Sequence, residues 1–114
     1  LVVDDDDAAR ELLCRHLARD GFRVVSASSG EAGLRLAREA VPDLITLDVC
    51  MPGMTGWEFT RKVRDEPALS EIPIVIVTML QEAEQQYDGV AAGFLLKPVK
   101  SGDLLRVACR LTGC

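Results

Sequence analysis

Short apolar runs and amphipathic stretches alternate along the whole chain. The apolar runs are rich in valine, isoleucine and leucine, which favours strands, and they occupy residues 1–3, 22–27, 44–47, 74–77 and 94–96. Between them, apolar residues recur three and four positions apart, as on one face of a helix, around residues 9–17, 34–41, 56–63 and 104–111. A polar stretch at residues 82–87 is the fourth of five expected helices and the most weakly marked.

Regular alternation of strands and helices predicts an α/β fold, in which a parallel sheet carries helices on both faces. Residues 74–77 form an uninterrupted β-branched run, as expected of a central strand that is buried on both faces. We therefore expect a three-layer sandwich with a five-stranded parallel sheet and five helices.

Residues that start and stop helices stand at the expected boundaries. Gly21 follows the first helix and Pro42 follows the second. Ser28 or Ser29 is placed to cap the second helix, and Ser101 is placed to cap the last.

Composition and charge narrow the class of protein. The chain has 114 residues, enough for one domain with its own core, and 48% of them are hydrophobic. Its net charge of −5 argues against direct nucleic-acid binding, because phosphate backbones attract lysine and arginine. No apolar run approaches the roughly 20 residues of a membrane-spanning helix, so we expect no membrane insertion. The chain starts at Leu1, inside an expected strand and without a methionine, so we expect residues 1–114 to be a single domain excised from a longer chain.

Polar side chains follow four of the five expected strands at the point where each strand ends. Asp4 and Asp5 follow the first strand and Asp48 the third. Thr78 ends the fourth strand, and Lys97 follows the fifth. Ligands of open α/β sheets bind beyond the carboxyl ends of the strands, so these five side chains are expected to converge on one edge.

The chemistry of this set indicates phosphoryl transfer. Neighbouring carboxylates repel one another unless a cation joins them, and Mg²⁺ prefers oxygen ligands. Lys97 and Thr78 offer a positive charge and a hydroxyl donor to an anion. The set contains no histidine base and no serine or cysteine nucleophile, so a carboxylate is the nucleophile that remains, and carboxylates form aspartyl-phosphates. We therefore expect Mg²⁺-dependent phosphoryl transfer to an aspartate.

Three other residues near these strand ends have simpler interpretations. Asp6 and Asp7 are interpreted as the N-terminus of the first helix, where the helix dipole favours an anion, rather than as ligands. Trp57 falls beside the apolar face of its helix and is expected to be partly exposed.

Four segments, each at the end of an expected strand, together resemble a known family. They are VVDD at residues 2–5, LDVCMPGMTG at 47–56, VT at 77–78 and LKP at 96–98. In this order they resemble the receiver domain of two-component response regulators, over residues 1 to about 111. The resemblance implies a flavodoxin-like fold with strand order 2-1-3-4-5.

The resemblance also assigns roles to the strand-end residues. Asp48 is expected to accept a phosphoryl group from the phosphohistidine of a histidine kinase. Asp5 and Asp48 are expected to bind Mg²⁺ directly, together with the backbone carbonyl of Cys50, while Asp4 acts largely through water. Thr78 and Lys97 are expected to bind the phosphoryl oxygens.

Further expectations concern switching and access. Thr78 and Phe94 match the switch pair of the family, and the family usually has a cis peptide between residues that match Lys97 and Pro98. Met79 stands where a small residue is usual and Cys50 where a polar residue is frequent, so both are candidates for a gate at the mouth of the site. Residues 85–89 resemble receivers of hybrid sensor histidine kinases, which makes such a kinase a candidate parent chain.

The expected function is phosphorelay signal transduction in the cytoplasm. The domain would be a phosphoacceptor rather than an enzyme in the usual sense, although it would catalyse part of its own phosphorylation and dephosphorylation. Its donor would be a histidine kinase or a phosphotransfer domain. The output surface, formed by the last two helices and the strand between them, would contact an output domain, a partner protein or a second copy in a homodimer.

Three alternatives share this fold class. A phosphorylation-independent docking module would not need Asp4, Asp5, Asp48, Thr78 and Lys97. A flavin carrier would need a glycine- and hydroxyl-rich loop after the first strand, where four aspartates stand instead. An aspartate-nucleophile phosphatase would carry its nucleophile after the first strand and would need cap insertions, for which this chain has no room.

Overall fold

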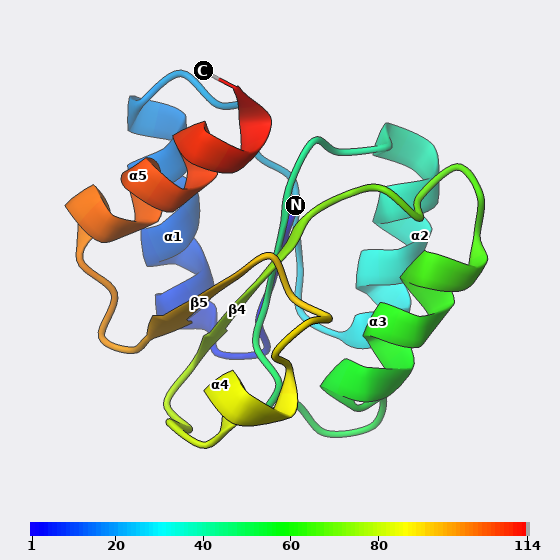
Figure 1. Cartoon of the computed structure of the whole chain (residues 1–114). Helices are drawn as coiled ribbons and strands as arrows, with labels where there is room; N and C mark the ends of the chain where they lie inside the picture. Colours follow the sequence, from blue (N-terminus) through cyan, green and yellow to red (C-terminus); the bar gives the residue numbers. More distant parts are fainter. Residues whose placement is uncertain (114) are drawn as a thin grey trace.

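The computed structural model describes residues 1–113 and confirms the predicted α/β sandwich (Figure 1). Five parallel strands form one sheet in the order β2-β1-β3-β4-β5, as the resemblance implied. The strands are β1 (Val2–Val3), β2 (Ser26–Ala27), β3 (Ile45–Leu47), β4 (Ile74–Thr78) and β5 (Gly93–Leu96). The helices are α1 (Asp7–Arg19), α2 (Gly30–Ala40), α3 (Gly56–Asp65), α4 (Ala83–Gln86) and α5 (Ser101–Thr112).

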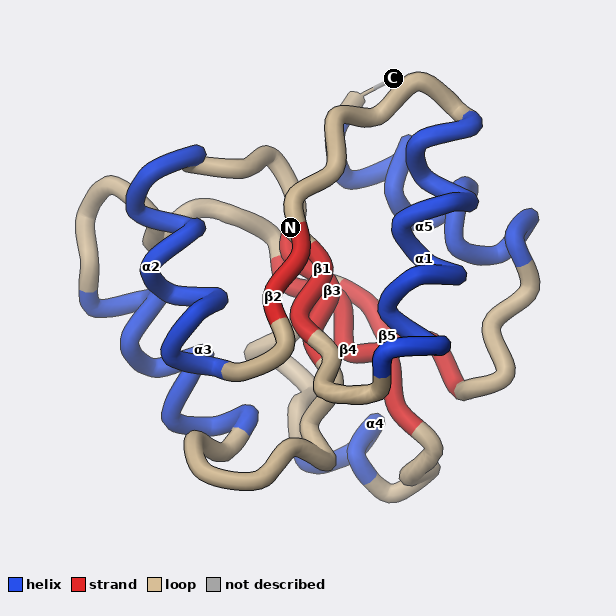
Figure 2. Tube along the Cα trace, turned by 180° about the vertical axis from the view of Figure 1, so that it is seen from behind, coloured by secondary structure: helices blue, strands red, loops and turns tan. Residues whose placement is uncertain are grey.

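The sheet lies between two helical layers. Seen from behind, α1 and α5 lie on one side of the sheet and α2 and α3 on the other (Figure 2). Alternate side chains of strand β4 pack against the helices of the two layers. Its Ile74 and Ile76 belong to the apolar cluster that also contains residues of α2, α3 and α4, whereas Val75 and Val77 belong to the cluster beneath α1 and α5. The β-branched run thus fills two cores, as its sequence predicted.

Side-chain caps fix the beginnings of the first three helices. Asp6 caps α1, because its side chain accepts hydrogen bonds from the N–H groups of Ala8 and Ala9. Ser29 caps α2 in the same way. Thr55 and Glu58 form a reciprocal capping box at the start of α3. The last of these caps fixes the end of the loop that follows Asp48.

The prediction that Ser101 caps the last helix is wrong. Lys100 occupies the N-cap position with an extended backbone, and Ser101 is already the first helical residue. No side-chain hydrogen bond caps this end of α5.

The second strand is shorter than predicted. The expected strand covered residues 22–27, whereas β2 contains Ser26 and Ala27 alone. The N–H of Val2 donates to the carbonyl of Val25, and residues 22–24 are not part of a strand. Instead of pairing, they line a cavity of about 430 Å³ together with Leu1 and Leu44.

Among residues 1–113, no helix has the length and hydropathy needed to cross a membrane.

Candidate functional site

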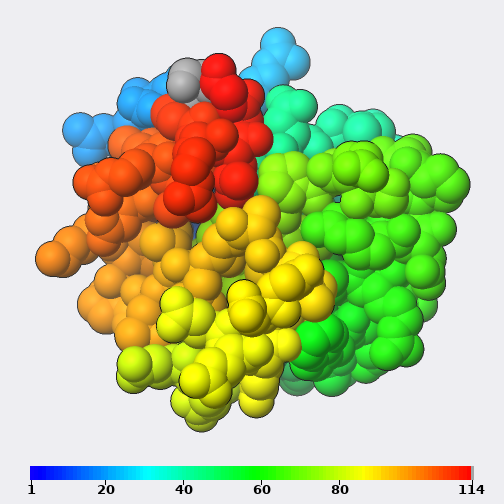
Figure 3. Space-filling view, in the orientation of Figure 1, coloured from blue at the N-terminus to red at the C-terminus, as the bar shows by residue number. Residues whose placement is uncertain are grey.

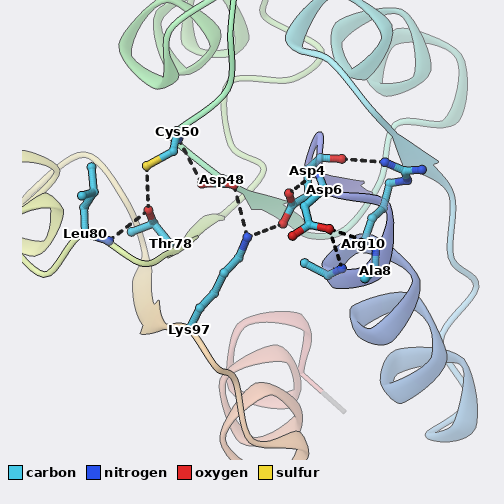
Figure 4. A network of polar contacts seen from close by, with 10 residues as sticks. Asp4, Asp6, Ala8, Arg10, Asp48, Cys50, Thr78, Leu80 and Lys97 are labelled. Carbon is cyan, nitrogen blue, oxygen red and sulfur yellow. Dashed lines mark hydrogen bonds and ion pairs between the residues drawn. The ribbon is translucent and has the colours of Figure 1, made fainter.

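Four strand ends bring the predicted residues together at one edge of the sheet. Asp4 and Asp5 follow β1, Asp48 follows β3, Thr78 ends β4 and Lys97 follows β5. The Lys97 side chain extends between two carboxylates (Figure 4). Its Nζ lies 2.7 Å from Asp4 Oδ2 and 3.2 Å from Asp48 Oδ2. The parallel sheet therefore brings together charged side chains from three separate segments of the chain, as predicted.

Backbone N–H groups orient the two buried carboxylates. Asp48 Oδ1 accepts a hydrogen bond of 3.0 Å from the N–H of Cys50, and Asp4 Oδ1 accepts one of 2.9 Å from the N–H of Asp6. Asp4 is fully buried and Asp48 is 6% exposed. Each carboxylate thus has one oxygen on the backbone and the other on Lys97, which restricts its rotation.

Asp5 completes a group of three carboxylates. One oxygen each of Asp4, Asp5 and Asp48 lies within 4.8 Å of the others. Asp5 is exposed, and within residues 1–113 no hydrogen bond or ion pair engages its side chain. A carboxylate oxygen is therefore free to bind a ligand at the open side of the site.

Burial and charge act against each other on the ionisable groups of the site. Burial raises the pKa of Asp4, although the hydrogen bond from Lys97 opposes the shift. Burial lowers the pKa of Lys97, but the hydrogen bond to Asp4 and the charges of Asp48 and Asp4 outweigh it, so that this pKa is raised. The ammonium therefore keeps its proton and its charge.

The donor set fits a small divalent cation. Three ionised carboxylates and one ammonium leave a net charge of −2. The three carboxylate oxygens lie within 4.8 Å of one another, and hard oxygen donors of this kind suit Mg²⁺. Carboxylates crowded in this way favour a cation that relieves their repulsion.

Thr78 contributes a buried hydroxyl beside the acceptor loop. The residue is fully buried. Its Oγ1 accepts a hydrogen bond of 3.3 Å from the N–H of Leu80 and lies 3.4 Å from Cys50 Sγ. Since a hydroxyl carries one proton, Thr78 has a single donor to offer to the Cys50 sulfur or to an anion at Asp48.

The family model of the response regulator receiver domain matches residues 1–108. The chain belongs to this family. The receiver is 41% identical over 103 residues to the transcriptional regulatory protein AfsQ1 of Streptomyces coelicolor; the match covers 88% of the receiver and 44% of AfsQ1. Protein PilH of Pseudomonas aeruginosa is 34% identical over 109 residues, which cover 93% of the receiver and 90% of PilH. The chemotaxis protein CheY4 of Vibrio cholerae has a TM-score of 0.88 at 34% identity, covering 96% of the receiver and 94% of that chain.

Family membership makes phosphorelay signal transduction the function of this receiver. The match does not favour a docking module that works without phosphorylation, and the five residues which such a module would not need all lie at the strand ends described above. The receiver spans less than half the length of AfsQ1, so the activity of a whole parent protein does not follow from this relationship.

The expected switch and gate residues differ in how deeply they are buried. Phe94 is half-buried in β5, opposite Ile76 of β4, and packs against the core on the α2–α3 side. The Lys97–Pro98 peptide is cis, as the resemblance implied. Met79 is 76% exposed, and Cys50 is also exposed.

An apolar groove adjoins Lys97 of the receiver. Its volume is about 290 Å³, and residues of α1 and of the segment after β5 form its walls. Leu12 and Met79, both exposed, lie on it, and Lys97 belongs to its lining. The groove therefore leads from the open surface towards the carboxylates.

Sequence reasoning missed two contributors to the site. Arg10 donates a hydrogen bond of 2.8 Å from its Nη1 to the Asp4 carbonyl, and its Nη2 pairs with Asp7. The spacing of three residues between Asp7 and Arg10 on a helix could have predicted this ion pair from the sequence. Tyr87 stacks on Trp57, which is partly exposed as predicted, and no local pattern connects these two residues.

Proposed function

We propose that this receiver accepts a phosphoryl group on Asp48 from the phosphohistidine of a histidine kinase or phosphotransfer domain. The observation that carries the proposal is the bridge from Lys97 to Asp4 and Asp48, with a third carboxylate, Asp5, open beside it. Such a site holds a cation and an anion next to each other, which is what transfer of a phosphoryl group to a carboxylate requires.

Asp5 and Asp48, with the backbone carbonyl of Cys50, would hold Mg²⁺ directly, and Asp4 would act through water. When bound, Mg²⁺ neutralises charge on the phosphoryl oxygens. The protein's own residues carry the remaining steps. A carboxylate oxygen of Asp48 attacks phosphorus while the bond from phosphorus to the histidine nitrogen breaks, and the bonding electrons stay on that nitrogen. Lys97 and Thr78 bind phosphoryl oxygens, and water later hydrolyses the aspartyl-phosphate.

Labelling by a small phosphodonor tests the proposal. Acetyl phosphate with Mg²⁺ is expected to add one phosphoryl group to the domain, as measured by intact-mass spectrometry. Asp48→Asn should remove the gain, because the amide is not a nucleophile of comparable strength. A mass gain that survives in Asp48→Asn, or no gain in the native chain, contradicts the assignment.

Asp5→Asn is expected to weaken Mg²⁺ binding about tenfold or more, because it removes the charge of the open carboxylate while leaving the buried pair in place. Asp7→Asn is the matched control, since Asp7 is an exposed aspartate two residues further on that pairs with Arg10. Titration calorimetry with MgCl₂ measures the Mg²⁺ affinity of both variants. Equal affinities for the two variants would remove Asp5 from the ligand set.

We further propose that Met79 and Cys50 form a gate at the mouth of the site. A flexible methionine can cover a rim without filling it, and Met79 follows Thr78 directly. Met79→Ala is expected to speed acetyl-phosphate labelling and shorten the aspartyl-phosphate lifetime, each about tenfold, or ~1.4 kcal/mol of barrier. Leu80→Ala, at the next and also exposed position, is the control. Unchanged labelling and lifetime in Met79→Ala would show that this side chain does not restrict access.

Partners and setting follow from the same proposal. The apolar groove beside Lys97 offers a protein donor a surface continuous with the site. The switch pair Thr78 and Phe94 would pass the change to the surface of α4, β5 and α5, where an output domain, a partner protein or a second copy binds. The receiver would work in the cytoplasm as one part of a longer protein. Residues 85–89 favour a hybrid histidine kinase as that protein and AfsQ1 favours a transcriptional regulator, and the sequence on either side of residues 1–114 distinguishes them.

A further inference from the structure

Two aromatic rings join α3 to α4 next to the acceptor loop, which we define as residues 48–56. Trp57 is the second residue of α3, and Tyr87 is the C-cap of α4. Their ring centroids lie 4.6 Å apart with an angle of 15° between the planes, which is a stacked arrangement. The space-filling view shows the segment around α4 in direct contact with the beginning of α3 (Figure 3).

The Tyr87 side chain also packs against the backbone where the acceptor loop meets α3. A methyl group added at Gly56, where the loop passes into the first residue of α3, would overlap the Tyr87 hydroxyl. It would also lie 2.7 Å from Cγ1 of Val49, the residue directly after Asp48. Tyr87 is 4% exposed and belongs to the same core cluster against which Val49 packs. The Tyr87 hydroxyl therefore lies where the loop enters α3, on the same side of Gly56 as the residue that follows Asp48.

The position of this loop controls the phosphoacceptor directly. The N–H of Cys50 donates to Asp48 Oδ1, so a shift of the loop backbone moves the group that orients the carboxylate. Burial raises the pKa of Tyr87, so its hydroxyl stays neutral beside the acidic site. The ring can pack close to the loop without adding another negative charge.

The aromatic stack is also a main attachment of α4. This helix has four residues and no side-chain cap at its N-terminus. At its other end, the Tyr87 carbonyl accepts hydrogen bonds from the N–H groups of Val90 and Ala91. The ring that packs on the loop is thus fixed to the end of α4 and to the turn that leads towards β5.

We infer that Tyr87, held by Trp57, is a positioning residue for phosphoryl transfer to Asp48. It keeps the acceptor loop in place and joins that loop to α4. The inference rests on the proposed phosphorylation of Asp48. It follows that a movement of the acceptor loop should change the surroundings of the Trp57 ring. Loss of the Tyr87 ring should slow phosphoryl transfer to Asp48.

Labelling rates test the positioning role. Tyr87→Leu is expected to slow acetyl-phosphate labelling in Mg²⁺ about tenfold, since displacing a reacting group by ~1 Å can cost up to a hundredfold. Tyr87→Phe keeps the stacked ring and should stay within roughly twofold of the native rate. Leu69→Ala is the matched control for lost stability, because Leu69 is fully buried in the connection that enters β4, at the other end of that strand from Thr78. Trp57→Leu removes the stack at a partly exposed position and should also slow labelling, which keeps the test valid if Tyr87→Leu does not fold.

Fluorescence supplies a readout that a merely structural role would not change. Trp57 is the one tryptophan of the chain. Mg²⁺ with beryllium fluoride, a mimic of the phosphoryl group, should change its emission in the native chain and in Tyr87→Phe, but not in Tyr87→Leu. A native chain that is not labelled contradicts the proposed function itself. The positioning role alone is overturned if the native chain is labelled, Tyr87→Leu shows the native labelling rate and the native emission change, and Trp57→Leu also shows the native labelling rate.

Discussion

Replacing Lys97 by methionine is expected to slow phosphoryl transfer to Asp48 by a hundredfold or more. The ammonium is the one cation that contacts both buried carboxylates among residues 1–113. Removing a single donor that stabilises developing negative charge typically costs about 10²–10³ in rate. Methionine keeps most of the length and apolar character of the lysine stem, so the neighbouring groove should change little.

Mg²⁺ affinity separates this effect from collapse of the site. With the ammonium gone, the three carboxylates lose a competing positive charge, so Mg²⁺ should bind at least as tightly as in the native receiver. Lys100→Met, at an exposed lysine just before α5, is the control and should label at the native rate. If Lys97→Met labels as fast as Lys100→Met, then Lys97 is a structural partner of Asp4 and takes no part in the reaction.

Truncating Phe59 to alanine is expected to lower the free energy of unfolding by about 3–5 kcal/mol, a large part of the 5–15 kcal/mol typical of a domain. Phe59 is fully buried in α3, and its ring reaches the backbone of α2 at Gly33. A methyl group at Gly33 would lie 3.1 Å from that ring, so the packing leaves little room for rearrangement. The cavity would therefore persist instead of closing.

Urea denaturation followed by circular dichroism measures this loss. Lys62→Ala, on the exposed side of the same helix, should change the free energy of unfolding by less than ~0.5 kcal/mol. A Phe59→Ala variant as stable as Lys62→Ala would mean that the contact between α2 and α3 contributes little to the fold.

The order of elements and the reactive edge could be predicted because both are local properties of the chain. An apolar run predicts each strand, and the residue that follows the run can be assigned to the carboxyl edge of the sheet without knowledge of long-range contacts. Asp4, Asp48 and Lys97 could be predicted in this way, although the first and the last lie 93 positions apart.

The rest depended on which segments meet in space. The N-cap of α5 is set by the backbone at Lys100, so it could not be predicted from Ser101 itself. The contact of Cys50 with Thr78 spans 28 positions, and the stack of Trp57 on Tyr87 joins two helices. Contacts of this kind leave no periodic signal, because each partner is an ordinary residue in its own segment.

The identity of the phosphorylated residue is the central claim, and reduction by borohydride tests it most directly. Borohydride converts an aspartyl-phosphate into homoserine, which peptide mass spectrometry can place at a single position. After treatment with acetyl phosphate and Mg²⁺, we expect homoserine at position 48 and unmodified aspartate at positions 4 and 5, with no conversion when the donor or Mg²⁺ is left out. Homoserine at position 4 or 5, or a phosphorylated chain without homoserine at position 48, would contradict the account.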